Sequence, residues 1–214
     1  MTILKQPSSI LTNRKTCKIC GKDDLVGEEW FSSVCNECKI KIDIKRHYEQ
    51  MVQSLPVKYR NIIDRFDMEK QAKEICDKSL YLYGKTGTGK TALATFILKE
   101  LWSLGKKGKF ISFPGFVMWL QGNIEMSYEE IKDNAKYDGC LIIDDFGAER
   151  LTDYVRSVIY YMINTREQNE LQTIITSNYP IKEINHKVDD RIASRISGMC
   201  EVIEMQGKDK RIKT

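Results

Sequence analysis

A glycine-rich segment that ends in a lysine and a threonine has the residue types that bind phosphate. It reads G-K-T-G-T-G-K-T and fits the pattern G-x-x-x-x-G-K-[ST]. Glycines let the backbone wrap so closely that successive N–H groups point at a phosphate, and the lysine adds a positive charge. The threonine hydroxyl is a ligand for Mg²⁺. The pattern predicts that ATP and Mg²⁺ bind at Gly84, Lys85, Thr86, Gly87, Thr88, Gly89, Lys90 and Thr91.

Two acids at the end of an apolar stretch supply the second half of such a site. Leu141, Ile142 and Ile143 are followed directly by Asp144 and Asp145. Asp144 is expected to hold Mg²⁺ through water, and Asp145 to orient or deprotonate the water that attacks the γ-phosphate. Paired acids are often only a solvated strand end, but the phosphate-binding pattern upstream favours the catalytic interpretation.

Three further polar residues fit the same chemistry. Asn178 follows an apolar stretch and would position the hydrolytic water if its strand lies beside the phosphate loop, although S-N-Y-P alone is ordinary turn chemistry. Arg191 and Arg195 share one helical face at spacing i, i+4. They are either solvated surface residues or guanidinium groups offered to the γ-phosphate of a neighbouring subunit. Which of the two arginines would reach across is left open.

Four of the seven cysteines form two C-x-x-C pairs, which are separated by 14 residues. This spacing is typical of a structural zinc site, because four thiolates complete the tetrahedral coordination of zinc and leave no open position. The predicted Zn²⁺ ligands are Cys17, Cys20, Cys35 and Cys38. The odd total argues against a disulfide framework. The other three cysteines are expected to be small buried apolar residues: Cys76, Cys140 and Cys200.

The composition sets limits on the functional class. The chain has 214 residues, enough for one sizeable core and a small appended module, and its formal net charge is +4. Residues 1–60 hold 11 Lys/Arg against 7 Asp/Glu, so the whole excess lies there and is too small for a strong nucleic-acid footprint. We find no apolar run that could cross a membrane and no signal-peptide pattern, so we expect a cytoplasmic protein with no membrane partner.

The elements that must position these residues alternate between short apolar strands and helices. The pattern predicts an α/β fold whose five-stranded parallel sheet is flanked by helices. The expected strands are 79–83, 109–113, 139–144, 172–177 and 201–205. Two helices are clearest, one that follows Lys90 and buries Leu104 among other residues, and one that follows Asp153 with its cap at Thr152 or Asp153. We place a zinc module and helical linker at 1–54 and the ATPase domain at 55–214.

These motifs, in their order along the chain, resemble one family. G-K-T-G-T-G-K-T, L-I-I-D-D-F-G-A-E-R, I-I-T-S-N-Y and D-R-I-A-S-R-I are similar to the bacterial helicase loaders of the AAA+ class. That family comprises the DnaC- and DnaI-like loaders, their phage counterparts and the IstB-like transposition ATPases. The resemblance covers nearly three quarters of the chain, from residue 55 to about residue 211.

The resemblance implies a role for each matched motif. Gly84 to Thr91 would be Walker A, Asp144 and Asp145 Walker B, and Asn178 the sensor I residue. Arg195 would be the arginine finger with Arg191 as its companion, so that the ATP site is completed by self-association. The chain leaves no room after Arg195 for the helical lid found in many AAA+ proteins. In DnaI-type loaders an N-terminal zinc module contacts the helicase.

The resemblance leads to one preferred function and two alternatives. We expect an ATPase, slow and stimulated by partners, that binds a replicative DnaB-type helicase and single-stranded DNA during initiation of DNA replication. The alternatives are an IstB-like transposition ATPase that remodels target DNA, and a nucleotide-gated adaptor with little turnover. A DNA groove between the Walker motifs would combine lysines with aromatic side chains, although Phe113 and Phe116 fit the core equally well.

Overall fold

The computed structural model describes residues 15–23, 25, 28–60, 72, 74–123, 127–148 and 151–207. The chain forms two compact units, Met1–Arg46 and His47–Thr214. The division falls inside helix α2 (Asn36–Ser54), whereas the boundary expected from the sequence lies at the end of that helix.

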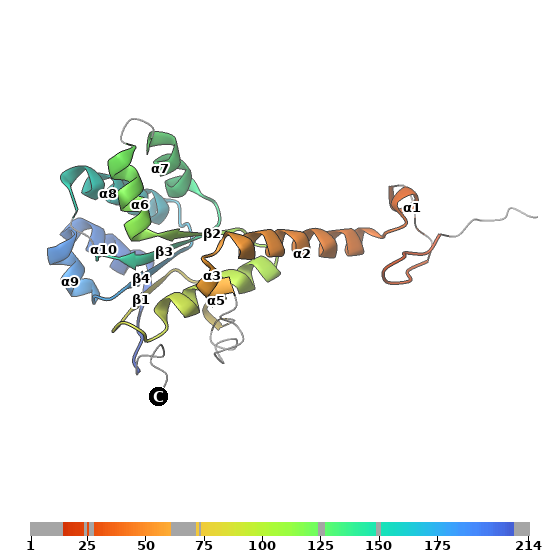
Figure 1. Ribbon diagram of the computed structural model, residues 1–214, viewed down its shortest axis with the longest axis horizontal. Helices are drawn as coiled ribbons and strands as arrows, with labels where there is room; N and C mark the ends of the chain where they lie inside the picture. The colour runs from red at the N-terminus through yellow and green to blue at the C-terminus, as the bar shows by residue number, and fades with distance from the viewer. Residues whose placement is uncertain are drawn as a thin grey trace, which may run out of the picture. The chain divides into compact units, whose positions relative to one another are not determined.

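In the described part of the second unit, five parallel strands form one sheet in the order β2-β3-β4-β1-β5 (Figure 1). The predicted five-stranded parallel sheet is therefore confirmed. The strands are β1 (Leu80–Tyr83), β2 (Gly108–Ser112), β3 (Cys140–Phe146), β4 (Thr173–Ser177) and β5 (Glu201–Glu204).

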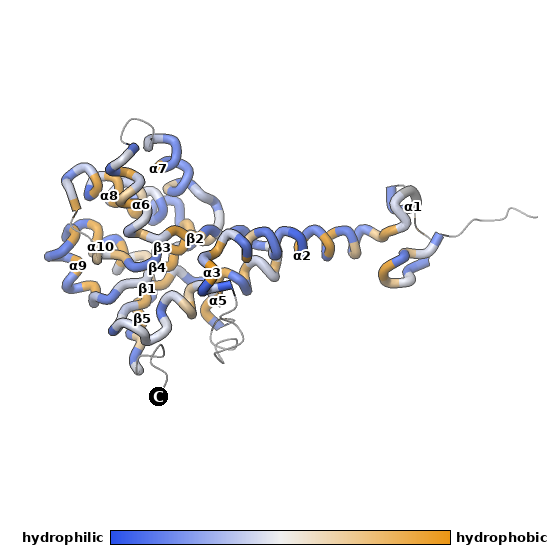
Figure 2. Tube along the Cα trace, viewed as in Figure 1, coloured by the Kyte–Doolittle hydropathy of each residue, from blue (hydrophilic) through white to orange (hydrophobic). Residues whose placement is uncertain are grey.

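Helices cover both faces of the sheet, and the side chains of the strands alternate between them. Tyr81 and Ile143 pack with helices α6 to α10, whereas Leu82 and Ile142 pack with α5 and with the part of α2 that belongs to this unit. Figure 2 shows apolar stretches along the strands between these layers. The helices of this unit after α2 are α3 (Val57–Arg60), α5 (Lys90–Ser103), α6 (Phe113–Gly122), α7 (Ser127–Lys136), α8 (Asp153–Gln168), α9 (Ile181–Lys187) and α10 (Asp190–Met199).

Local signals in the sequence account for several helix ends. The Thr152 hydroxyl accepts a hydrogen bond from the N–H of Val155, so the predicted N-cap of α8 is confirmed. Gly105 has a φ of 72° just beyond α5, as a C-terminal glycine does. The expectation that Leu104 is buried is wrong, because α5 ends at Ser103 and the Leu104 side chain is 57% exposed.

At the amino-terminal edge of the sheet, the fully buried Arg166 of α8 joins three elements. Its guanidinium donates five hydrogen bonds of 2.7–3.1 Å, all to uncharged oxygens that belong to the end of α7 and the starts of β3 and β4. The acceptors are the carbonyls of Asn134, Tyr137, Gly139 and Gln172 and the hydroxyl of Thr173. Burial lowers the pKa of Arg166 to about 10, so the group stays charged at neutral pH.

The residues of the predicted nucleotide site lie at the opposite, carboxyl-terminal edge of the sheet. Because the strands are parallel, the segments that follow β1, β3 and β4 emerge along one edge. β4 lies between β1 and β3, so Asn178 stands between the glycine loop and the two acids.

The first unit is small. Its short helix α1 (Glu28–Ser32) precedes α2, and the four paired cysteines lie around these helices. None of the helices in the described ranges is long and apolar enough to cross a bilayer.

Candidate nucleotide site and metal centre

The glycine loop after β1 needs its glycines. Gly84, Gly87 and Gly89 have φ values of 150°, 84° and 101°, which other residues rarely adopt. A Cβ on Gly84 would also lie 2.3 Å from the carbonyl oxygen of Met205, just beyond β5. The Gly84 N–H donates to the carbonyl of Ser177 at 3.3 Å, so this residue is enclosed by the ends of β4 and β5. The loop can therefore turn its backbone N–H groups toward an anion.

Lys90 opens α5, and its side chain is held inside this loop. Only 5% of the residue is exposed, and Nζ donates to the carbonyls of Gly84 (2.8 Å) and Lys85 (3.0 Å). Nζ also donates to Oδ1 of Asn178 at 2.9 Å. The structure thus brings the loop lysine and the candidate sensor asparagine into direct contact, although 88 residues separate them along the chain.

The two acids at the end of β3 occupy different surroundings. Asp144 is 5% exposed, and burial raises its pKa, while hydrogen bonds from the hydroxyls of Thr176 and Thr91 oppose that rise. Asp145 is exposed and has a φ of 59°. A buried carboxylate next to a threonine hydroxyl offers the hard oxygen ligands that Mg²⁺ prefers, so this donor set fits that ion.

A hydroxyl that the sequence reasoning did not single out connects the two acids. Thr176 of β4 is fully buried, and its Oγ1 donates to Oδ1 of Asp144 at 2.7 Å. The same Oγ1 accepts the backbone N–H of Asp145 at 3.0 Å. A threonine inside an apolar strand reads as an ordinary β-former, so no sequence signal pointed to it.

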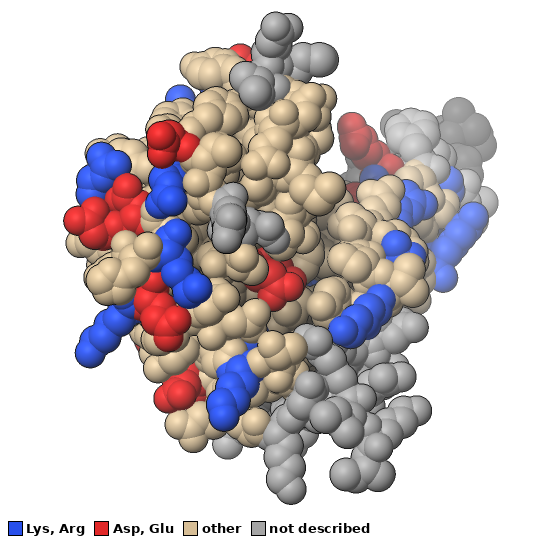
Figure 3. Space-filling model, turned by 60° about the vertical axis from the view of Figure 1, so that its left-hand side comes forward, with Lys and Arg blue, Asp and Glu red and all other residues tan. Residues whose placement is uncertain are grey.

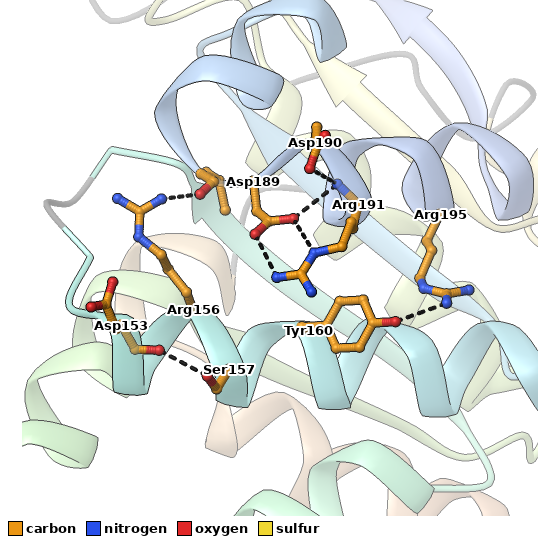
Figure 4. A network of polar contacts seen from close by, with 9 residues as sticks. Asp153, Arg156, Ser157, Tyr160, Asp189, Asp190, Arg191 and Arg195 are labelled. Atoms are coloured by element: carbon orange, nitrogen blue, oxygen red, sulfur yellow. Dashed lines mark hydrogen bonds and ion pairs between the residues drawn. The ribbon is translucent and has the colours of Figure 1, made fainter.

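The candidate finger arginines extend from α10 toward α8, as Figure 4 shows. The Arg191 side chain is 68% exposed and pairs with Asp189 at 3.0 Å. Arg195 is less exposed, at 30%, and its guanidinium donates to Glu167 and to the Tyr160 hydroxyl, the latter at 3.0 Å. Both guanidinium groups lie over the Tyr160 ring, 5.0 Å and 5.2 Å from its centroid.

The sequence analysis missed Tyr160 and Glu167 as partners of these arginines. They are seven residues apart on α8 and therefore share one face, which was the available signal. Together with α10 they line an open depression on the surface. The arginines are not free surface charges in this arrangement, because each has a defined acidic partner on the protein.

The four paired cysteines converge in the first unit. Their sulfur atoms all lie within 4.8 Å of one another, and Sγ of Cys20 and Cys35 are 3.6 Å apart. Zinc–sulfur bonds of 2.3 Å in a tetrahedron place the sulfurs about 3.8 Å apart, so the cluster fits zinc. Hydrogen bonds from the backbone of Cys20 and Cys35 lower the pKa of Cys17 to about 6, whereas burial raises that of Cys38 to about 12.

Part of the stretch between the Walker motifs is core or paired with acids, whereas Tyr128 is 67% exposed and Nζ of Lys132 lies 5.8 Å from the centroid of its ring. Phe113 and Phe116 are 2% and 9% exposed, so they belong to the core. Three of its lysines are paired with acids: Lys107 with Asp138, Lys109 with Glu130, and Lys132 with Glu129. On the face drawn in Figure 3, basic and acidic side chains are likewise interspersed.

Comparison with known proteins places the chain in a family. The sequence profile described as "IstB-like ATP binding protein" matches residues 72–214, more than half of the chain. The chain belongs to this family of ATP-binding proteins. Its second unit is accordingly an AAA+ domain, as the motifs predicted.

The chain is also similar to two helicase loaders. The chain is 30% identical over 148 residues to the replicative helicase loader DnaI of Bacillus subtilis (strain 168), covering 63% of this chain and 48% of that protein. It is 25% identical over 121 residues to the replicative helicase loader DnaC of Escherichia coli (strain K12), covering 55% and 49%. The chain thus spans about half the length of these relatives.

A solved structure supports the fold. A crystal structure of DnaI matches 79% of this chain and 93% of its own with a TM-score of 0.56 and 24% identity. At that identity the likeness concerns the fold alone.

Proposed function

We propose that this chain is an ATP-dependent loader that binds a replicative DnaB-type helicase and single-stranded DNA during initiation of replication. The observation that carries the proposal is the 30% identity over 148 residues to the helicase loader DnaI. The four-cysteine cluster ahead of the ATPase domain adds support, because the resemblance to DnaI-type loaders implies such a module.

The nucleotide site is proposed to act through residues already close together. Lys90 exchanges its bonds to Gly84, Lys85 and Asn178 for bonds to phosphate oxygens, and the loop N–H groups donate to the same phosphates. Thr91 and Asp144 would hold Mg²⁺, and the ion would supply charge neutralisation at the phosphates.

Asp145 and Asn178 then orient the attacking water, Asp145 as the base that receives its proton. The aspartate side chain is shorter than the glutamate found in many AAA+ proteins, so we infer slow hydrolysis that partners stimulate. Steady-state ATP turnover, measured with and without single-stranded DNA, checks this. No turnover in either condition would favour the adaptor with little turnover.

We propose that self-association completes the site, with Arg195 as the residue that reaches the neighbouring γ-phosphate. Arg195 is held between Glu167 and Tyr160, whereas Arg191 is tied to Asp189 on its own helix end. A mixing experiment tests this. The Asp145→Asn variant keeps both arginines but is expected not to hydrolyse ATP. The Arg195→Ala variant keeps both Asp144 and Asp145.

If Arg195 acts in trans, each variant alone is inactive, and the mixture regains turnover at interfaces that combine an intact acid pair with an intact arginine. The same mixture prepared with Arg191→Ala distinguishes the two arginines. Full turnover by Arg195→Ala alone would contradict the assignment.

The cysteine cluster is proposed to hold one Zn²⁺ that stabilises the first unit. Binding free energy of about 10 kcal/mol or more is available from a structural zinc site, enough to order a segment with little core of its own. Elemental analysis of the purified protein is expected to find about one zinc per chain, and Cys35→Ser is expected to lose it. Disulfides in place of bound metal would overturn the proposal.

The main alternative is an IstB-like transposition ATPase, which the description of the matching family favours. Native mass spectrometry of the protein mixed with a replicative helicase, with and without ATP and Mg²⁺, separates the two. A defined complex that releases this chain on hydrolysis supports loading, and Lys90→Met serves as the control that cannot cycle. No association under any nucleotide condition would favour the transposition ATPase.

A further inference from the structure

We propose that Thr176 is the positioning residue of the ATP site, because its single hydroxyl group holds both Asp144 and Asp145 in a bulge of β3. The inference rests on the proposed function, since it concerns how the two acids are aligned for Mg²⁺ and water. Thr176 itself is fully buried, and its hydroxyl contacts both acids.

The bulge is visible in the register of β3 against β4. Ile143 pairs with Ile175 and Phe146 with Ser177, so two residues of β3, Asp144 and Asp145, face the single residue Thr176. The extra residue adopts a left-handed conformation, with φ 59° at Asp145. Such bulges turn a side chain away from the regular alternation of a strand. Here the result is that consecutive acids differ, Asp144 being buried and Asp145 exposed.

A bulge leaves a backbone group without its ladder partner, and Thr176 provides a substitute. Its Oγ1 accepts a hydrogen bond from the backbone nitrogen of Asp145 at 3.0 Å. The same hydroxyl donates a hydrogen bond to Oδ1 of Asp144 at 2.7 Å. A hydroxyl can do both at once because it carries one donor and two acceptor sites. The position of one acid is thereby linked to the backbone of the other.

The neighbouring hydroxyl of β4 cannot take over this role. Oγ of Ser177 donates to the carbonyl of Phe146 at 2.7 Å and accepts the N–H of Tyr179 at 3.1 Å. Ser177 therefore closes the far side of the bulge and is already engaged. Removing the Thr176 hydroxyl leaves the partly buried Asp145 N–H without this acceptor and the Asp144 carboxylate without this donor.

Loss of the Thr176 hydroxyl is expected to change metal affinity and turnover but not metal-free ADP affinity. The phosphate-binding loop does not include Thr176, so affinity for ADP without metal is expected to stay within twofold of wild type. Metal affinity and turnover depend on the aligned acids, and loss of a residue that orients a metal ligand lowers such quantities about tenfold to hundredfold.

The experiment compares three substitutions with a matched control in the full-length protein. Thr176→Val and Thr176→Ala remove the hydroxyl, whereas Thr176→Ser keeps it. The control is Thr173→Val on the same strand, where the buried hydroxyl accepts from Arg166 and touches neither acid. Mn²⁺ affinity in the presence of ADP is measured by electron paramagnetic resonance, single-turnover ATP hydrolysis by quench, and stability by thermal melting.

The expected result is that Thr176→Val and Thr176→Ala lower Mn²⁺ affinity and turnover about tenfold or more, while Thr176→Ser stays near wild type. Thr173→Val is expected to lower the melting temperature without that loss. Unchanged metal affinity in both deletion variants would overturn the role of Thr176, as would an equal loss in Thr173→Val. A wild-type protein that binds Mn²⁺ with ADP but does not turn over would refute only the proposed hydrolysis, because the metal readout still tests Thr176.

Discussion

Each of the two edges of the sheet contains a buried cation that is held by oxygen atoms. The two cations differ in what they are bonded to. At the amino-terminal edge, the guanidinium of Arg166 donates five hydrogen bonds to four backbone carbonyls and one hydroxyl. At the carboxyl-terminal edge, Nζ of Lys90 donates to two carbonyls of a glycine loop and to the amide of Asn178. Arg166 joins three elements, whereas Lys90 joins the glycine loop to the residue that follows β4.

The difference lies in what each cation is able to exchange. The planar guanidinium fork of Arg166 matches fixed acceptors at the ends of regular elements, so any movement breaks several bonds at once. The lysine ammonium is a point charge on a flexible stem, and one of its partners is an exposed side chain. The amino-terminal edge thus has a purely structural cation, whereas under the proposed function the bonds at the carboxyl-terminal edge would be replaced by bonds to phosphate.

The largest expected effect is on stability, at Arg166. Arg166→Met leaves five oxygens without their donor, two of them at fully buried bonds, and is expected to lower the free energy of unfolding by about 3–5 kcal/mol, as measured by urea titration. Arg191→Met, at a side chain that is 68% exposed, is the matched control and is expected to cost less than about 1 kcal/mol. An equal loss of unfolding free energy in the two variants would show that the buried arginine stabilises the fold no more than the exposed one.

The next effect is on binding, at Lys90. Lys90→Met is expected to weaken ATP binding about tenfold to hundredfold, because charge-assisted hydrogen bonds to phosphate are lost. Its unfolding free energy should change by less than about 1 kcal/mol, since the hydrogen bonds of Lys90 to Lys85 and Asn178 are only partly buried and water can replace the lost donor there. Titration with a fluorescent nucleotide and urea unfolding measure the two. A stability loss as large as that of Arg166→Met would show that Lys90 also stabilises the fold.

A smaller effect on ATP affinity is expected at Asn178, the side-chain partner of Lys90. Asn178→Asp places a carboxylate beside Nζ of Lys90, which holds the lysine more firmly and repels phosphate. We expect ATP affinity to fall about tenfold, equivalent to about 1.4 kcal/mol. Asn178→Ser, which adds no charge, should bind ATP more tightly than Asn178→Asp. If the two variants bind alike, the contact between Asn178 and Lys90 does not govern the exchange.

The smallest effect concerns Asp144, whose pKa is raised mainly by burial. With a folded-state pKa above the unfolded value, the native state binds more protons, so its stability falls as pH rises through that folded pKa. Asp144→Asn avoids the buried charge and should melt a few degrees higher at pH 7 without nucleotide and metal. The difference should shrink on acidification, because the wild-type carboxyl then becomes neutral. A variant that melts below wild type at pH 7 would contradict this account.

The parts of the site that follow from consecutive residues could be predicted. The glycine loop depends on the local backbone, and Asp144 and Asp145 end a single strand, so their pattern is complete within short stretches of sequence. The apolar face of α8, from Val155 to Ile163, is likewise local, and its residues are buried as the spacing indicated.

The rest depends on contacts between distant segments. Arg166 falls three residues after Ile163 on the same face of α8, but its acceptors are mainly backbone carbonyls, which leave no mark in a sequence. The bulge at Asp145 arises from the register of β3 on β4, and register is a property of the assembled sheet. Leu104 was expected to be buried because its spacing fits the face of α5, yet the helix ends one residue earlier.

Helix α2 has a practical consequence for anyone who dissects this protein. Its C-terminal half carries Tyr48, Met51 and Val52, which pack against the apolar cluster of α5. An expression fragment that begins at residue 55 would remove these side chains and uncover that cluster, which invites aggregation. A fragment that begins at or before His47 keeps them. Residues 47–54 of α2 are thus a structural part of the AAA+ domain.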